Sequence, residues 1–133
     1  MDKIIDNLYL GDLKSAQDPE WLGRFYITHI VTLDKNLAPM YPKKYTYYTV
    51  PILDEPTENI AKHFNSVCTF AKKAIRRDSA NVLIHCTTGN SLSVCFVTAY
   101  LIKIHDYLLK DALKLIKKIR PKIKPHPIFL SQV

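Results

Sequence analysis

Four short runs of apolar, aromatic and β-branched residues occur along the chain, at 7–11, 28–33, 45–50 and 82–84. Residues of these types favour strands because their side chains fit a pleated, half-buried surface. The run at 82–84 contains no polar residue, as expected of a strand that is covered on both faces. The pattern therefore predicts four strands, the last of them buried.

Between these runs the apolar positions recur with the spacing of helices. In residues 58–77 they fall on one stripe of a helical surface, made of Ile60, Phe64, Val67, Cys68, Ala71 and Ile75. Residues 92–104 are almost wholly apolar, which predicts a central helix covered on most sides. A proline in the first turn predicts a short helix over 18–24. The pattern at 111–120 predicts a last amphipathic helix, which the following proline ends.

Strands and helices alternate, so the predicted fold is α/β, with helices packed on a central, mostly parallel sheet. A length of 133 residues fits a single compact domain over 1–133, and no repeat or flexible linker divides it. No run approaches about 18 consecutive apolar residues, so we expect no membrane span. The N-terminus lacks the basic start and long apolar region of a secretion signal.

The number and placement of the cysteines indicate the cellular compartment and the kinds of site that the chain is able to form. The chain has three cysteines, an odd number without zinc-type pairs, which argues against a disulfide scaffold and a structural metal site. Cys68 and Cys95 fall on apolar helix surfaces and are interpreted as core residues. We therefore expect an intracellular location, cytoplasmic with the nucleus as an alternative, and no metal or cofactor.

The formal net charge of +7 comes from basic residues grouped at 43–44, 72–77 and 114–124. One interpretation is attraction to phosphorylated or otherwise acidic partners. The other, which we favour, is that these residues form the solvated faces of two helices. No nucleic-acid-binding motif accompanies the charge, so a nucleic-acid partner is not expected. Nothing in the sequence predicts an oligomeric state.

The segment 82–93 joins the buried strand to the central helix through a short loop. His85 and Cys86 end the strand, and the chain continues as Thr87, Thr88, Gly89, Asn90, Ser91, Leu92 and Ser93. A loop of this kind points backbone N–H groups at one spot beside the positive end of a helix dipole. The sequence therefore predicts an anion-binding loop with a thiol at its floor.

Four residues supply chemistry to such a site. The loop amides and the helix N-terminus are expected to lower the pKa of Cys86, which makes its thiol a candidate nucleophile rather than a core residue. Gly89 lets the backbone curl around a phosphate, where a side chain would clash. The Ser93 hydroxyl is placed to hydrogen-bond the sulfur and to support it as a leaving group. His85 is expected to pack behind the loop and to hydrogen-bond its backbone.

Asp54 lies in the segment 51–57, which has two prolines and is predicted as a loop. Dephosphorylation through a cysteinyl-phosphate needs an acid that protonates the leaving oxygen, and a carboxylate on a loop is able to reach such a site. The competing interpretation is a turn residue, which the spacing alone favours.

These residues resemble the small dual-specificity protein phosphatases, a family of cysteine-dependent phosphatases, over essentially the whole chain. The likeness rests on the His-Cys loop and on the segments 7–11, 27–31, 54–60 and Arg120-Pro121, with Phe129 and Gln132. It implies a compact α/β domain with a shallow site, open to phosphotyrosine and to phosphoserine or phosphothreonine. It also implies that Asp54 holds the general-acid position. The segment 54–60 further resembles pseudophosphatases that interact with phosphorylated Ser, Thr and Tyr.

One position departs from the family signature of His-Cys, five residues, Arg, and then Ser or Thr. Leu92 stands where the resemblance implies an arginine that clamps the phosphoryl oxygens. A leucine has neither charge nor donor, and no other arginine is an obvious replacement. We therefore expect a dead or severely impaired pseudophosphatase that binds phosphoproteins or other signalling partners. The alternatives are a weakly active phosphatase that uses Cys86 and Asp54, and an interaction protein that ignores phosphate and binds through its basic face.

Overall fold

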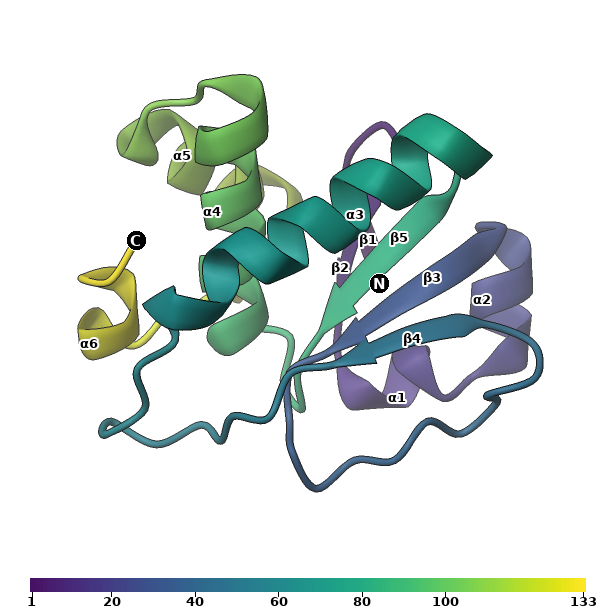
Figure 1. Cartoon of the computed structure of the whole chain (residues 1–133). Coiled ribbons are helices and arrows are strands. Elements are labelled where there is room, and N and C mark those ends of the chain that lie inside the picture. Colours follow the sequence, from purple (N-terminus) through teal and green to yellow (C-terminus); the bar gives the residue numbers. More distant parts are fainter.

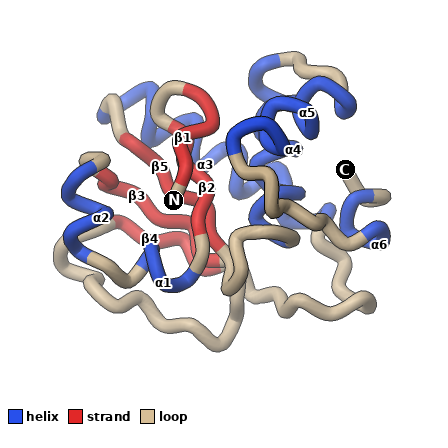
Figure 2. Tube along the Cα trace, turned by 180° about the vertical axis from the view of Figure 1, so that it is seen from behind, coloured by secondary structure: helices blue, strands red, loops and turns tan.

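The computed structural model describes all 133 residues and contains one five-stranded sheet (Figures 1 and 2). Its strands lie in the order β1–β2–β5–β3–β4, with the bounds β1 Asp2–Ile5, β2 Leu8–Gly11, β3 Ile27–Thr32, β4 Thr46–Thr49 and β5 Asn81–His85. β1 pairs antiparallel with β2, and the other neighbours are parallel. The predicted mostly parallel sheet is confirmed, with β5 at its centre.

Helices cover both faces of this sheet (Figure 1). On one face lie α3 (Phe64–Asp78), α4 (Leu92–His105) and α5 (Leu109–Ile119), and on the other α1 (Leu13–Ala16) and α2 (Pro19–Arg24). A short 3-10 turn, η1 (Ala61–His63), precedes α3, and α6 (Pro127–Leu130) packs against α4. The predicted central helix is α4, and most of its residues are buried.

The alternation of side chains along β5 explains why helices cover both faces. Val82 and Ile84 join the larger apolar cluster, which includes residues of α3, α4 and α5. Leu83 points the other way, into the smaller cluster with residues of α1 and α2. All three side chains are fully buried, as expected for a strand between two helical layers. This packing fixes the position of the chain that follows β5.

The helix predicted from residue 58 begins later in the structure. Residues 58–60 are irregular, and η1 and α3 follow them. The Glu58 carboxylate is engaged in the preceding loop, where it accepts the Leu53 N–H at 2.9 Å. The Ile60 N–H donates to Gln132 Oε1 at 2.7 Å. These contacts with distant groups override the helical pattern at the start of the segment.

Three short elements, β1, α1 and α6, are not among those that the sequence pattern predicts. α5 begins at Leu109 rather than at the expected residue 111, and it ends at Ile119, before the proline. None of the helices is both long enough and apolar enough to cross a membrane.

Candidate functional site

The loop 86–91 lies where parallel strands of the sheet end. It follows β5 directly, between the ends of β2 and β3. The Leu13 N–H, just after β2, donates to the Thr87 carbonyl at 3.1 Å, and the Leu33 N–H, just after β3, donates to the His85 carbonyl at 3.1 Å. The carboxyl ends of parallel strands are where α/β proteins bind their ligands. The predicted position of the loop, between a buried strand and the central helix, is confirmed.

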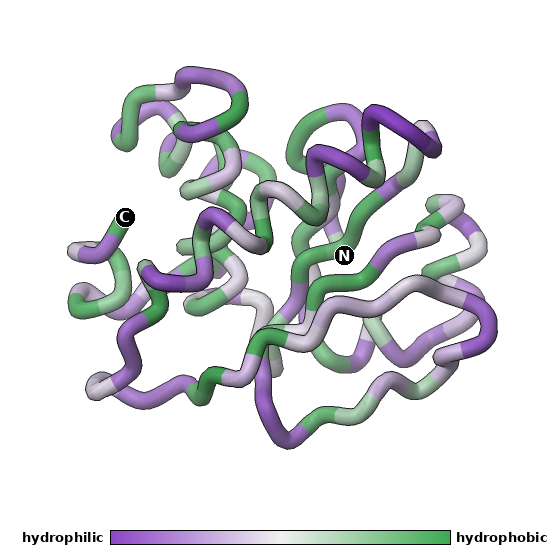
Figure 3. The backbone as a smooth tube through the Cα atoms, in the orientation of Figure 1, coloured by the Kyte–Doolittle hydropathy of each residue, from purple (hydrophilic) through white to green (hydrophobic).

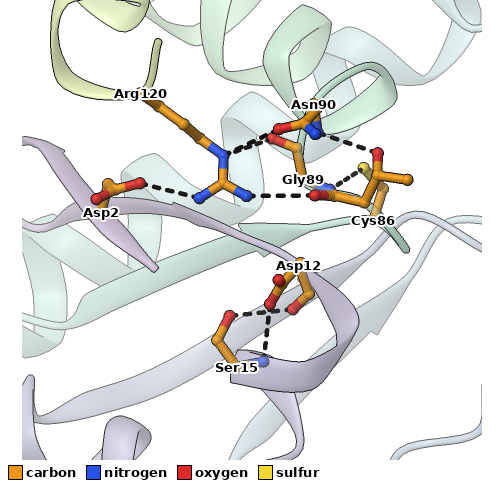
Figure 4. A network of polar contacts seen from close by, with 8 residues as sticks. Asp2, Asp12, Ser15, Cys86, Gly89, Asn90 and Arg120 are labelled. Carbon is orange, nitrogen blue, oxygen red and sulfur yellow. Dashed lines mark hydrogen bonds and ion pairs between the residues drawn. The ribbon is translucent and has the colours of Figure 1, made fainter. Parts of the chain in front are cut away.

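Cys86 lies at the floor of this loop, and Figure 4 shows its sulfur in contact with the Gly89 N–H. Its Sγ lies 3.1 Å from Ser93 Oγ, and the Gly89 N–H donates to the same sulfur at 3.3 Å. Cys86 is 3% exposed. A hydroxyl and an amide are therefore both aimed at one sulfur. The structure thus brings the three predicted residues together, and the role of Cys86 as a nucleophile stays a prediction.

Gly89 adopts a backbone conformation that suits glycine. Its φ is 72°, in the left-handed region that side chains disfavour. A Cβ atom at this position would also lie 2.5 Å from Arg120 Nη2 and 2.8 Å from the Gly11 carbonyl oxygen. The turn of the loop and its close approach to the end of β2 therefore both depend on a glycine here.

Leu92 is the first residue of α4 and points into the protein. It is 1% exposed and belongs to the larger apolar cluster. A buried aliphatic side chain donates no hydrogen bond to an anion in the loop. The neighbouring Ser91 makes no capping bond with its side chain, and its Oγ accepts the His126 N–H at 3.2 Å instead. The hydroxyl therefore leaves the first amides of α4 unoccupied.

Arg120 braces the loop from outside, a role that the sequence did not indicate (Figure 4). Its Nε donates to the Gly89 carbonyl at 2.9 Å and to Asn90 Oδ1 at 3.3 Å. Its Nη2 donates to the Thr88 carbonyl at 3.2 Å. Its Nη1 forms an ion pair with Asp2 Oδ2 at 2.9 Å. The guanidinium thus binds the carbonyl groups of the loop and a carboxylate of β1, so it does not replace the missing clamp.

His85 is buried behind the loop, as expected, but its partner is different. Its Nε2 lies 2.9 Å from Thr32 Oγ1 in β3, while Nδ1 is buried without a hydrogen-bond partner. The hydrogen bond that the ring makes is therefore to the neighbouring strand, while the Cys86 backbone lies close enough to affect its pKa. Burial lowers the pKa of His85 to about 4, against the smaller opposing effects of the Cys86 backbone, Asp12 and Asp34. The ring is consequently neutral at pH 7.

The other two cysteines are core residues, in agreement with the sequence. Both are buried, free and part of the larger apolar cluster. Burial raises the pKa of the Cys68 thiol to about 11. Burial also raises the pKa of Cys95 to about 12, with smaller contributions from the charges of Cys86 and Asp54. Neither thiol is activated as a nucleophile.

Asp54 lies on the exposed stretch between β4 and η1. Its carboxylate makes no hydrogen bond and no ion pair, so it is unengaged by the protein. Its charge contributes, with that of Cys86, to the raised pKa of Cys95. An exposed, unengaged carboxylate is free to act as an acid, and this role of Asp54 stays a prediction.

Residues 123–133, here called the C-terminal strap, connect the loop 86–91 to the chain just after Asp54. The Lys124 N–H donates to the Asn90 carbonyl at 2.8 Å. At the other end, Gln132 Nε2 donates to the Glu58 carbonyl at 3.0 Å. The strap therefore contacts the loop 86–91 at one end and, at the other end, the chain just after Asp54.

A buried cysteine beneath a loop, at the end of the central strand of a mostly parallel sheet, is the arrangement expected of the cysteine-dependent phosphatases that the sequence resembles. The sequence matches the family described as "Dual specificity phosphatase, catalytic domain" over residues 8–133. The chain belongs to this family, as the resemblance of its motifs implied.

Relatives of known sequence agree with this assignment. Dual specificity protein phosphatase 1 of Arabidopsis thaliana is 35% identical over 130 residues, which are 98% of this chain and 65% of the relative. Human dual specificity protein phosphatase 15 is also 35% identical over 130 residues, and the match covers 98% of this chain and 43% of that protein. The chain therefore spans less than two thirds of the length of these relatives.

Solved structures share the fold. The crystal structure of DUSP15 has a TM-score of 0.93 at 36% identity, covering 99% of this chain and 83% of that one. The human tyrosine phosphatase-like serine/threonine/tyrosine-interacting protein has a TM-score of 0.89 at 28% identity, covering 99% of this chain and 91% of that one. The predicted single phosphatase-like fold is confirmed.

Proposed function

We propose that this chain is a pseudophosphatase, a dual-specificity phosphatase domain that binds phosphoproteins or other signalling partners and has lost most or all turnover. The observation that carries the proposal is the buried, apolar Leu92 at the position of the clamping arginine. Arginines in comparable phosphoryl-transfer roles contribute about 10³–10⁵ in rate, because they stabilise the charge of the transition state. A leucine contributes nothing of this kind.

No other arginine supplies the missing charge. Arg120 already binds Thr88, Gly89, Asn90 and Asp2 with its guanidinium. Arg24 stacks over the Trp21 ring of α2, 4.8 Å from its centroid, on the other face of the sheet. The remaining two arginines lie in the last turn of α3, which leads into the start of β5 rather than its end. This distribution supports the loss of catalysis.

The presence of Leu92 in place of an arginine also affects the phosphate binding that we expect. A Cys86 thiolate that faces a phosphate dianion, without a guanidinium beside it, is a like-charge contact. We expect weak phosphate binding near neutral pH and tighter binding once Cys86 is replaced by a neutral residue. The similarity to a human phosphatase-like protein named as an interacting protein supports a binding role. Three free cysteines support an intracellular setting, cytoplasmic or nuclear.

The test is hydrolysis of p-nitrophenyl phosphate by the protein and its Leu92→Arg variant, with Cys86→Ser as the blank. We expect the unchanged protein to match the blank and Leu92→Arg to gain about 10³-fold or more. Leu92→Lys is the matched control, because it adds charge without the planar fork. Thermal unfolding of each variant verifies that it is folded. A rate typical of active family members in the unchanged protein, abolished by Cys86→Ser, would overturn the proposal.

A second candidate is a weakly active phosphatase, with Cys86 as the nucleophile and Asp54 as the acid. The observation that favours it is the intact sulfur environment, with Ser93 Oγ at 3.1 Å and the Gly89 N–H at 3.3 Å. Slow turnover that disappears in Cys86→Ser and falls in Asp54→Asn would establish this candidate. Slow turnover that is unchanged in both variants would exclude it.

A further inference from the structure

Four cations gather on the outer side of α3, and we call them the α3 basic face: Lys72, Lys73, Arg76 and Arg77. Because residues four apart are neighbours on a helix, Lys72 lies beside Arg76 and Lys73 beside Arg77. Lys72 is half-buried, and the other three are exposed. The C-terminal half of α3 is a strongly hydrophilic stretch in Figure 3.

These four cations have no partner within the protein. None of them takes part in a salt bridge or a side-chain hydrogen bond. The nearby acids contact other groups, since Asp78 lies 3.9 Å from the His29 ring and Asp6 forms an ion pair with Lys3 at 2.8 Å. Like charges four residues apart destabilise a helix. The stability of the domain therefore gives little reason for this arrangement.

The surface around the α3 basic face is hollowed. One recess of about 460 Å³ is lined by Thr69 and the four cations, with no apolar residue. A second, of about 320 Å³, shares Lys72 and Arg76 and is also lined by Asp6 and His105. A third, of about 200 Å³, shares Lys73 and Arg77 and is also lined by His29 and Asp78. The three recesses adjoin one another across α3, which suits an extended ligand rather than a single ion.

We propose that the α3 basic face binds an anionic segment of a partner protein, a stretch rich in Asp, Glu or phosphorylated residues. Carboxylates and phosphates fit the guanidinium fork, and successive acidic side chains match successive cations along the recesses. No large exposed apolar side chain lies on α3, whereas surface-binding membrane helices pair their cations with such anchors. The face also lacks the exposed aromatic rings on which nucleic-acid bases stack.

This surface is separate from the anion loop. α3 leads into the start of β5, and the loop follows the end of β5. The five residues of β5 separate the two ends by about 16 Å at the usual rise of a strand. One partner is therefore able to place a phosphorylated residue in the loop and an acidic stretch on α3. The proposal does not depend on whether the loop catalyses.

The test measures binding of a fluorescein-labelled peptide of alternating Glu and Ala, roughly 12 residues long, by fluorescence anisotropy at about 50 and about 150 mM NaCl. Arg76→Gln/Arg77→Gln is compared with Lys114→Gln/Lys118→Gln, which removes the same charge from exposed positions of α5. We expect the first pair to weaken binding about three- to tenfold at the lower salt, and the control less than about twofold. The proposal concerns α3 alone, so the outcome of this test is independent of turnover at the loop.

Three outcomes would overturn the proposal. The first is no binding of the peptide, and the second is an equal loss in both charge variants, which would indicate bulk attraction only. The third is binding to phosphatidylserine-containing vesicles or to single-stranded DNA that depends on Arg76 and Arg77 while the peptide does not bind. That result would assign the surface to a lipid or a nucleic acid. Circular dichroism and thermal unfolding verify that both variants keep the fold.

Discussion

Arg120→Ala is expected to destabilise the domain as strongly as a typical core truncation, although Arg120 lies at the edge of the site. The substitution removes hydrogen bonds to the carbonyls of Gly89 at 2.9 Å and Thr88 at 3.2 Å, and the ion pair with Asp2 at 2.9 Å. Hydrogen bonds to charged groups contribute about 1.5–3 kcal/mol each. Its side chain is only 17% exposed, so solvent screens these bonds incompletely.

For each hydrogen bond of Arg120 we take the lower end of this range of free energies, because water is able to reach the loop carbonyls once the side chain is gone. Two such bonds then give about 3 kcal/mol. The Asp2 side chain is 35% exposed, so its ion pair adds only about 0.5–1 kcal/mol. We therefore expect Arg120→Ala to lower the free energy of unfolding by about 3–4 kcal/mol. Arg120→Lys keeps the charge without the fork and is expected to cost about 2 kcal/mol.

The assay is equilibrium unfolding in urea, followed by circular dichroism and by the fluorescence of Trp21. Asp2→Asn is the matched control, because it removes the ion pair and leaves the bonds to the loop. Its expected cost is about 1 kcal/mol or less. A cost of Arg120→Ala below about 1 kcal/mol would refute the reasoning. So would an equal cost for Asp2→Asn, since the ion pair would then account for the whole effect.

Three further predictions concern other parts of the site. The pKa of His85 falls from 6.5 to about 4 on folding, so between these pH values the unfolded chain binds a proton that the folded protein does not. The free energy of unfolding should therefore fall by about 3 kcal/mol from pH 6.5 to 4 in urea titrations, with a smaller slope in His85→Asn. Gly89→Ala should cost about 2 kcal/mol or more in thermal unfolding, because it combines a positive φ with a close contact. Burial raises the pKa of Cys68 to about 11 and that of Cys95 to about 12. Both thiols should therefore resist iodoacetamide at about pH 8 until urea unfolds the protein. Modification of either residue in the folded protein, detected by mass spectrometry, would contradict their burial.

The sequence was sufficient for the layers of the fold because periodic patterns carry that information. The stripe of α3, the apolar length of α4 and the unbroken apolar run of β5 each predict an element that the structure contains. The pattern fails for β1, where the charged Asp2 and Lys3 interrupt the strand-like composition. Patterns also fail where a distant residue overrides them, as Gln132 does at Ile60 before α3.

In the site, too, features set by neighbouring residues were predictable and features set by distant residues were not. The loop residues are contiguous in sequence, so their proximity to Cys86 was predictable from the strand–loop–helix pattern. The contacts of Arg120 with that loop were not predictable, because Arg120 and Asp2 are 118 positions apart and the family likeness at Arg120-Pro121 does not say what the side chain binds. The partner of His85 was missed for a similar reason, since Thr32 lies 53 positions away on a neighbouring strand.

The contacts of Arg120 and of the C-terminal strap also bear on the order in which the domain assembles. They join residues 118 positions apart at Asp2 and 74 apart at Glu58. Contacts so distant in sequence form after local ones, because closing a long stretch of chain costs entropy. Substituting Arg120 or Gln132 should therefore accelerate unfolding and leave the folding rate nearly unchanged in stopped-flow experiments. The anion loop would then reach its final form late in folding and lose it early in unfolding, so the two ends of the chain determine how long the site persists.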